Sequence, residues 1–295
     1  MHRFGRRSAA VTAGIVFAGL SLLGGITAAP ASAASTSNSN STSNSNPNNY
    51  LALGDSVPFG YNPLLVTPGV SPDVFVGYPQ LASDLFRPRK KLFNASCPGE
   101  TSTSLITGTR PDNGCQDYRQ FIGPLHVSYS GSQLGYAESY LAANPRTGLV
   151  TMMIGANDLF LLIKSCGGST NVTCIEAGLP GLLDTLSSNL TTIYSGLRAA
   201  GFNGELVAVT YYSLNYADPV GTGIIAEINT TLAKVTQAFG GTVADGFGEF
   251  QQAAAAFGGD SCAAGLLIHL TPTTCDVHPS PAGAALLAVA VRDAS

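Results

Sequence analysis

The chain has 295 residues, of which 11% are charged, and its formal net charge is −4. It is acidic and has no more than three basic residues in succession, which argues against nucleic acid or an anionic membrane surface as a partner. Without an export segment its length fits a single α/β domain.

The N-terminal 33 residues are predicted to be a signal peptide. Arg3, Arg6 and Arg7 make the start positive, and residues 9–26 form an almost uncharged apolar run. Ala31-Ser32-Ala33 follows, a small-x-small pattern that signal peptidase cleaves. A membrane anchor is the alternative, because the run is nearly long enough to span a bilayer, but the cleavage pattern and the many Gly and Ala residues favour removal. We therefore expect a secreted, extracellular protein with no integral membrane segment after cleavage.

Residues 34–49 are almost entirely Ser, Thr and Asn, a composition that cannot bury a core. We expect them to be a disordered spacer and residues 50–295 to be the folded domain. Removing residues 1–33 takes away three arginines and no acidic residue, so the formal net charge changes from −4 to −7. No repeat and no second linker divides the domain, which we expect to be a monomer.

Short buried strands alternate with amphipathic helices along the domain. The clearest helix has apolar residues at spacings of three and four from Leu179 to Leu197. Pro180 fits its first turn, and Gly201 follows its end. This alternation indicates a mostly parallel sheet covered on both faces, with functional loops at the carboxyl ends of the strands. The other predicted elements are strands at 49–53, 91–94, 149–154, 205–210 and 242–245 and helices at 223–239 and 280–291.

All six cysteines lie in the expected exported domain, and an even number in a secreted chain indicates disulfides. Each bridge between sequence neighbours would close a short loop and stabilise the fold by ~2–4 kcal/mol. Zinc binding is the rival interpretation, but the chain has no C-x-x-C pair and only four histidines, so we expect no metal. The expected pairs are Cys97–Cys115, Cys166–Cys174 and Cys262–Cys275.

Gly54-Asp55-Ser56 follows the first predicted strand. A serine hydroxyl is a weak nucleophile that needs an adjacent base, usually histidine, and acyl transfer also needs donors at the oxyanion. By itself this tripeptide is consistent with an ordinary turn. It is not the G-x-S-x-G elbow of the α/β-hydrolases, because Pro58 occupies the last glycine position.

Four sequence blocks occur in order along the domain. Each is weak singly, but together they resemble the SGNH (GDSL-type) hydrolase family over about residues 50–291. The export signal and the cysteine pairs are most similar to those of secreted actinobacterial lipases and esterases. The resemblance implies a three-layer α/β/α sandwich with a mostly parallel, flavodoxin-like central sheet. The blocks are Leu51-Ala-Leu-Gly54-Asp55-Ser56, Asn94-Ala-Ser-Cys-Pro-Gly99, Gly155-Ala-Asn157-Asp158 and Asp276-Val-His278-Pro279.

By that resemblance, Ser56 is the nucleophile and His278 is the general base. The backbone N–H groups of Ser56 and Gly99 and the side-chain amide of Asn157 would form the oxyanion hole. Glycine permits a close backbone approach, and asparagine supplies a neutral donor. The structural alternatives are that Asn157 is a helix cap or turn residue and that Gly99 is a plain loop glycine.

The last block departs from the family pattern. The family usually has Asp three residues before the histidine, where this chain has Cys275. Asp276, two residues before His278, is our candidate for the third member of a triad, which orients the imidazole. The alternative is a dyad in which a backbone carbonyl orients His278. The other histidines of the domain, His126 and His269, lack any such sequence context.

The resemblance implies hydrolysis of carboxylic esters through an acyl-enzyme on Ser56, with a lipid or short-chain acyl ester as substrate. Removal of acetyl groups from a polysaccharide is the alternative enzymatic function, although the chain has no Trp to stack on sugars. A non-catalytic secreted binding protein on a hydrolase scaffold is the alternative of another class. The sequence has no phosphate-cradling loop and no dinucleotide fingerprint, so we expect no cofactor.

Overall fold

The structure is a computed structural model that describes residues 48–295. The expected signal peptide and residues 34–47 of the expected spacer lie outside the described residues. Within residues 48–295, no helix is long and apolar enough to cross a membrane.

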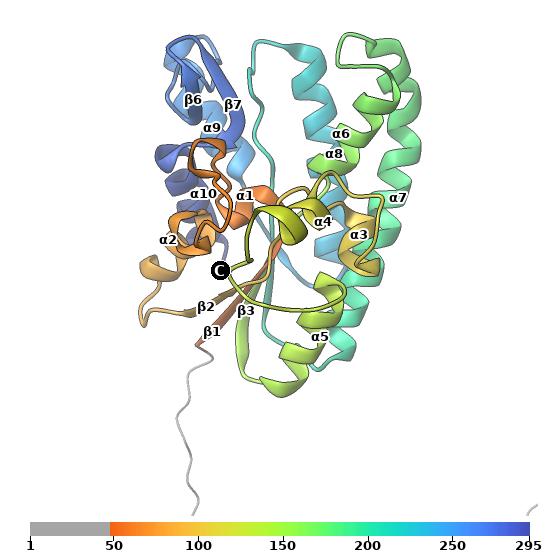
Figure 1. The fold of residues 1–295 in the computed structure, drawn as a ribbon, viewed down its shortest axis with the longest axis vertical. Coiled ribbons are helices and arrows are strands. Elements are labelled where there is room, and N and C mark those ends of the chain that lie inside the picture. Colours follow the sequence, from red (N-terminus) through yellow and green to blue (C-terminus); the bar gives the residue numbers. More distant parts are fainter. Residues whose placement is uncertain (1–47) are drawn as a thin grey trace, which may run out of the picture. The chain divides into compact units, whose positions relative to one another are not determined.

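A five-stranded parallel sheet forms the centre of the fold (Figure 1). Each strand coincides with a predicted one to within two residues at either end, so the predicted mostly parallel sheet is confirmed. The strands are β1 (Asn49–Gly54), β2 (Lys91–Asn94), β3 (Thr147–Met153), β4 (Glu205–Val209) and β5 (Thr242–Ala244). Their order in the sheet, β2-β1-β3-β4-β5, is the flavodoxin-like one.

Helices cover both faces of this sheet. The ten α-helices are α1 (Ser56–Phe59), α2 (Tyr78–Leu85), α3 (Ser102–Thr107), α4 (Cys115–Asp117), α5 (Gln133–Ala143), α6 (Ala156–Ser165), α7 (Val172–Ala199), α8 (Pro219–Ala238), α9 (Gly246–Ala254) and α10 (Pro281–Ala294), counted over the part of the chain that the structure describes. Four further helical segments of other types lie between them among the described residues, at Pro63–Leu65, Pro72–Val74, Tyr118–Ile122 and Ala255–Phe257. Figure 1 shows α2 and α10 on one side of the sheet and α5 and α7 on the other, which makes a three-layer α/β/α sandwich.

The apolar stripe predicted for residues 179–197 is the buried face of α7, where Leu186, Leu190 and Ile193 are fully buried. The helix begins earlier than predicted, because the Asn171 side chain caps it by accepting the Cys174 backbone N–H. Pro180 therefore lies inside the helix, and its predicted place in the first turn was wrong. The cap and the Cys166–Cys174 disulfide hold the turns that precede the proline.

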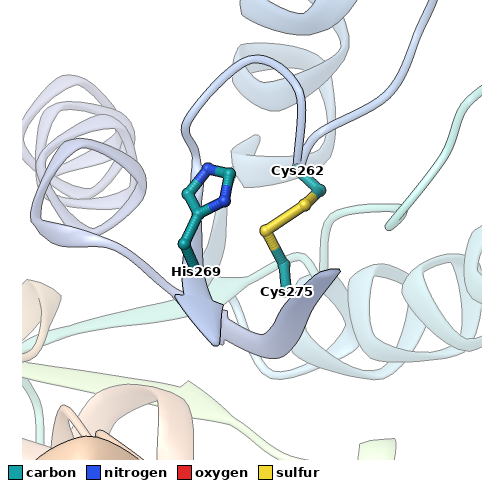
Figure 2. A group of neighbouring side chains, drawn as sticks. All are labelled: Cys262, His269 and Cys275. Carbon is teal, nitrogen blue, oxygen red and sulfur yellow. A yellow bond between two sulfur atoms is a disulfide. The ribbon is translucent and has the colours of Figure 1, made fainter. Parts of the chain in front are cut away.

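The segment that carries Asp276 and His278 is a strand, which the sequence did not predict. Strand β7 (Thr274–Pro279) pairs antiparallel with β6 (Leu267–Thr271) in a hairpin apart from the central sheet. Strand β7 is half-buried or exposed and lacks the apolar run that revealed the central strands, whereas β6 begins with the buried Leu267 and Ile268. A disulfide joins Cys275 to Cys262 in the turn before β6, and His269 lies beside it on the neighbouring strand (Figure 2).

Candidate active site

The turn after β1 places Ser56 at the first position of α1. Gly54 ends the strand with a φ of 134°, which side-chain-bearing residues rarely adopt, and a Cβ there would lie 2.0 Å from the Met153 carbonyl oxygen on β3. Asp55 then caps α1, because its Oδ1 accepts the backbone N–H of Val57 at 3.0 Å. Ser56 therefore lies at the carboxyl end of a central strand, where open α/β sheets bind their ligands.

The structure brings Ser56, His278 and Asp276 together in one line of hydrogen bonds. Nε2 of His278 lies 2.8 Å from Oγ of Ser56. On the other side of the ring, Nδ1 of His278 is hydrogen-bonded to Oδ1 of Asp276, and that oxygen also accepts the backbone N–H of His278 at 3.1 Å. A proton on Nδ1 leaves Nε2 free to accept the hydroxyl proton of Ser56.

The spacing of Asp276 and His278 follows from the strand in which they lie. Residues two apart in a strand point to the same face, so the carboxylate and the imidazole are neighbours on β7. Burial by itself would raise the pKa of Asp276, but the hydrogen bond and charge of His278 and the backbone N–H groups of Val277 and His278 outweigh it and lower that pKa. The carboxylate therefore stays ionised at neutral pH and can hold the Nδ1–H.

Asn157 lies in the first turn of α6 and lines the same cavity as Ser56. The helix cap is Gly155, so Asn157 is not the cap. The Asn157 side chain is buried, and its Nδ2 donates to the Glu100 carbonyl oxygen at 2.9 Å and lies 3.5 Å from Oδ2 of Asp55. Nδ2 of Asn157 therefore lies between the loop that carries Gly99 and Glu100 and the turn that carries Asp55 and Ser56.

Gly99 belongs to the loop that follows β2. Its φ is 82°, and a Cβ there would lie 2.5 Å from the carbonyl oxygen of Asn113, so the position requires glycine. The backbone N–H of Cys97 donates to the Gly54 carbonyl oxygen at 3.1 Å. This bond places the loop that carries Gly99 next to the turn that carries Ser56.

Two buried polar residues beneath this turn were missed by sequence analysis. Gln133 clamps Gly54, because its Oε1 accepts the Gly54 N–H at 2.6 Å and its Nε2 donates to the Gly54 carbonyl oxygen at 2.9 Å. The same Nε2 donates to Oε2 of Glu100 at 3.1 Å, and the Ser104 hydroxyl donates to Oε1 of Glu100 at 2.5 Å. Burial raises the pKa of Glu100 to about 7 despite these bonds. Sequence analysis did not find these residues because a single buried polar residue makes no repeating pattern. For Glu100, its position next to Gly99 could have served as a signal.

The segment after β4 is hydrogen-bonded both to the turn that carries Ser56 and to the strand that carries His278. The Tyr211 hydroxyl donates to Oδ2 of Asp55 at 2.5 Å, and the Tyr212 hydroxyl donates to the Val277 carbonyl oxygen at 2.7 Å. Burial raises the pKa of Asp55 to about 6, although the Tyr211 and Val57 hydrogen bonds and the charge of His278 act to lower it. The two tyrosines, which sequence analysis also missed, thus support the turn with the serine and the strand with the histidine.

A cavity of about 500 Å³ opens beside Ser56 and His278. Its walls come from α6, the start of α7 and the start of α8, and they are mainly apolar. Pockets of ~300–1,000 Å³ are typical of sites that enclose small ligands. The apolar wall includes Leu159, Phe160, Ile163, Val172, Ile224 and Ile225.

The remaining sequence candidates lie away from this line of hydrogen bonds. His126 is half-buried, with Nε2 2.9 Å from the Phe59 carbonyl oxygen, and His269 is exposed. The structure contains the three disulfides expected from the sequence: Cys97–Cys115, Cys166–Cys174 and Cys262–Cys275.

Two groups of potential metal ligands occur among the described residues, and each includes both sulfurs of a disulfide. A cysteine must be a free thiolate to bind a metal ion. Neither group therefore offers a metal site while its disulfide is intact. The groups are Cys97, Glu100 and Cys115, and Cys262, His269 and Cys275, the second of which is drawn in Figure 2.

The sequence profile of the GDSL-like lipase/acylhydrolase family matches residues 52–286. The chain belongs to this family. Membership makes it a carboxylic ester hydrolase, in agreement with the reaction class expected from the sequence. No curated protein matches the chain.

Solved structures share this fold at low sequence identity. Phospholipase A1 from Streptomyces albidoflavus NA297 is 19% identical with a TM-score of 0.54, and the match covers 84% of this chain and 99% of that chain. The extracellular lipase from Streptomyces rimosus is 16% identical with a TM-score of 0.54 and the same coverage, 84% and 99%. The acetylxylan esterase Axe2 from Geobacillus stearothermophilus is 15% identical with a TM-score of 0.51, covering 83% and 92%. These likenesses agree in the α/β fold.

The buried Glu100 carboxyl is expected to make stability depend on pH. Its pKa is about 7 in the folded chain against an ordinary value of 4.5. Between these values the folded state keeps a proton that the unfolded state has lost, so the free energy of unfolding falls as pH rises. The decrease, complete above about pH 7, is on the order of 3 kcal/mol.

Urea unfolding of the wild type and of Glu100→Gln from about pH 4 to about pH 8 measures this effect. As pH rises, the free energy of unfolding of Glu100→Gln is expected to increase steadily relative to that of the wild type. A difference that stays constant over the range would show that Glu100 does not titrate in this way.

Proposed function

We propose that this chain is a secreted ester hydrolase that cleaves esters of apolar acyl chains through an acyl-enzyme on Ser56. One observation carries the proposal: the line of hydrogen bonds from Ser56 through His278 to Asp276 lies beside an apolar cavity, which Ser56 and His278 help to line. The family supplies the reaction class, and we assign the apolar cavity to the acyl chain of the ester.

In the proposed mechanism, Nε2 of His278 takes the hydroxyl proton of Ser56 as Oγ attacks the ester carbonyl carbon. The negative charge that develops on the carbonyl oxygen faces the N–H groups of Ser56, Gly99 and Asn157. His278 then protonates the leaving alcohol, and the acyl group stays on Oγ. A water molecule, deprotonated by His278, attacks this acyl group and releases the carboxylic acid and the free serine.

The cavity favours an acyl chain longer than acetyl. From Asn157 to Ile163, α6 rises about 9 Å along one wall, and Phe160 and Ile224 also face this space. Burial of each methylene contributes about 0.8 kcal/mol, so every carbon that enters this space strengthens binding. With an expected net charge of −7, neutral or zwitterionic esters are better substrates than anionic ones.

Two alternatives are less well supported. Deacetylation of a polysaccharide is favoured by the shared fold with an acetylxylan esterase, but an acetyl group would leave most of the cavity unfilled. A non-catalytic binding role gives no reason for the hydrogen bonds that orient His278 between Ser56 and Asp276.

Export is part of the proposal. We propose that residues 1–33 are removed as a signal peptide, that residues 34–49 are a spacer and that residues 50–295 act outside the cell as a monomer. The three disulfides support this, because such bonds persist in oxidising compartments. The shared fold with Streptomyces lipase and phospholipase supports a relation to secreted actinobacterial enzymes.

Ser56→Ala removes the proposed nucleophile. Hydrolysis of p-nitrophenyl butyrate is expected to fall by at least about 10³-fold. The control is Ser139→Ala, which removes an exposed hydroxyl from α5 and is expected to keep full activity. If Ser56→Ala folds and retains the wild-type rate, the proposed acyl-enzyme is wrong.

Asp276→Asn distinguishes the triad from the dyad. An amide can donate to Nδ1 and so stabilise the wrong tautomer of His278, and kcat is expected to fall by about 10²–10⁴-fold. The control is Asp293→Asn at the exposed end of α10. A loss of kcat smaller than about tenfold in Asp276→Asn would favour the dyad, in which a backbone carbonyl orients the ring.

Ile224→Phe narrows the cavity. It is expected to lower kcat/KM for p-nitrophenyl octanoate at least about tenfold, since two displaced methylenes cost about 1.6 kcal/mol. Hydrolysis of the acetate is expected to change less than about twofold. Thr230→Phe adds the same ring on the exposed face of α8 and serves as the control. Equal losses on both esters would show that the acyl chain lies elsewhere.

A further inference from the structure

The loop between α3 and α4, residues 108–114, lies next to the proposed oxyanion donors and takes no part in the mechanism above. It is held at several points. Asp112 is buried, and its Oδ1 accepts the Gly114 N–H at 2.7 Å. The Thr101 hydroxyl donates to the Pro111 carbonyl oxygen at 3.0 Å, and the Cys97–Cys115 disulfide closes the loop behind it. The loop is therefore able to fix the position of a group that it carries.

The group that it carries is Asn113, which is hydrogen-bonded to both of the proposed donors outside the serine turn. Its backbone N–H donates to the carbonyl oxygen of Gly99 at 2.8 Å. Its side-chain Nδ2 donates to Oδ1 of Asn157 at 2.9 Å. Asn113 thus donates to an oxygen of Gly99 and to an oxygen of Asn157. Neither bond occupies the N–H groups of Gly99 or Asn157 that would bind the oxyanion.

The side-chain bond from Asn113 to Oδ1 and the bond from Nδ2 to the Glu100 carbonyl oxygen together fix which end of the Asn157 amide faces the reaction. A carboxamide has a donor end and an acceptor end of nearly the same shape. With Oδ1 of Asn157 held by Asn113, Nδ2 points to the Glu100 carbonyl oxygen and Asp55 beside the serine. A flipped amide would present its oxygen to the developing negative charge and would repel it.

The backbone bond acts on the other donor. The Gly99 carbonyl oxygen is fixed by the Asn113 N–H, and the Gly99 Cα lies so close to this loop that no Cβ fits. The left-handed conformation of Gly99 is therefore set by contact with residues 113 and 114. Substitution of the Asn113 side chain leaves this backbone bond in place, so the two effects can be separated.

We propose that Asn113 is a positioning residue of the oxyanion hole, which orients the Asn157 amide through its side chain and Gly99 through its backbone. This inference rests on the proposed function, because an oxyanion forms only if the chain catalyses acyl transfer. Asn113 was not among the residues that the sequence indicated, since a loop asparagine before glycine is typical of an ordinary turn.

The test compares variants of the secreted chain on p-nitrophenyl butyrate. Asn113→Ala is expected to lower kcat about tenfold, the equivalent of one hydrogen bond, and to leave KM within about twofold because the ground-state ester does not use the oxyanion donors. Asn113→Asp is expected to lower kcat further at neutral pH, since its carboxylate repels Oδ1 of Asn157. Gln116→Ala is the control: it removes a side-chain bond of the same loop, to the Gly108 carbonyl oxygen, without contact to Asn157.

A double-mutant cycle separates positioning from general loosening of the loop. In an Asn157→Ala background the amide that Asn113 orients is gone, so Asn113→Ala is expected to lower kcat less than about twofold further. A merely structural role would lower kcat by the same factor in both backgrounds. The thermal unfolding midpoint of each variant shows whether a loss reflects folding.

Three results would overturn the proposal. They are an Asn113→Ala kcat no lower than that of Gln116→Ala, equal factors in the two backgrounds, or a change confined to KM. If Ser56→Ala keeps wild-type activity, the proposed function itself has failed. If Ser56→Ala is inactive and Asn113→Ala matches the control, the function stands and this inference alone is wrong.

Discussion

The carbonyl oxygen of Met153 occupies the place where a side chain of residue 54 would have to be. Strands β1 and β3 approach this closely because residue 54 is glycine, and the Asp55 N–H donates to the same carbonyl oxygen at 3.3 Å. β1 consequently turns straight into α1, which carries Ser56, while β3 runs on to Asn157. The contact between Gly54 and Met153, at the carboxyl ends of β1 and β3, thus positions both Ser56 and Asn157. The rest of the candidate site is arranged around these two residues.

Beneath that contact the protein buries polar groups that a simple core would exclude. Glu100 and Asp55 are carboxyls with raised pKa values, and Gln133 and Tyr211 supply them with hydrogen bonds. Burying such groups costs free energy unless each has a partner, and a fully bonded network permits few alternative arrangements. The buried network lowers the free energy of unfolding at high pH, and it fixes the position of the turn that carries Ser56.

The histidine is held by different means. Its strand β7 has no fully buried residue, and the Cys262–Cys275 disulfide and the Tyr212 hydrogen bond to Val277 hold it in place. The ring of Tyr61 also lies against His278, with centroids 4.9 Å apart. Because Asp276 and His278 lie on the same face of strand β7, an acid two residues before the histidine contacts Nδ1, although cysteine stands three residues before it.

The sequence determined the features that depend on local pattern. Apolar runs gave the five central strands, the spacing from Leu179 to Leu197 gave the buried face of α7, and the order of the four blocks indicated the family. Disulfide pairing was also predictable, because each pair closes a short stretch of chain. Such features are set by residues close together in the sequence.

Only the tertiary structure decided the contacts between distant segments. It alone shows that Gln133 holds Gly54 through two hydrogen bonds, that Tyr211 contacts Asp55 and that Asn113 contacts both Gly99 and Asn157. Isolated polar residues such as Gln133 and Asn113 have no periodicity, so their hydrogen-bond partners cannot be predicted from the sequence. The physical reason is that a buried hydrogen bond specifies two atoms in space, whereas a sequence pattern specifies a face.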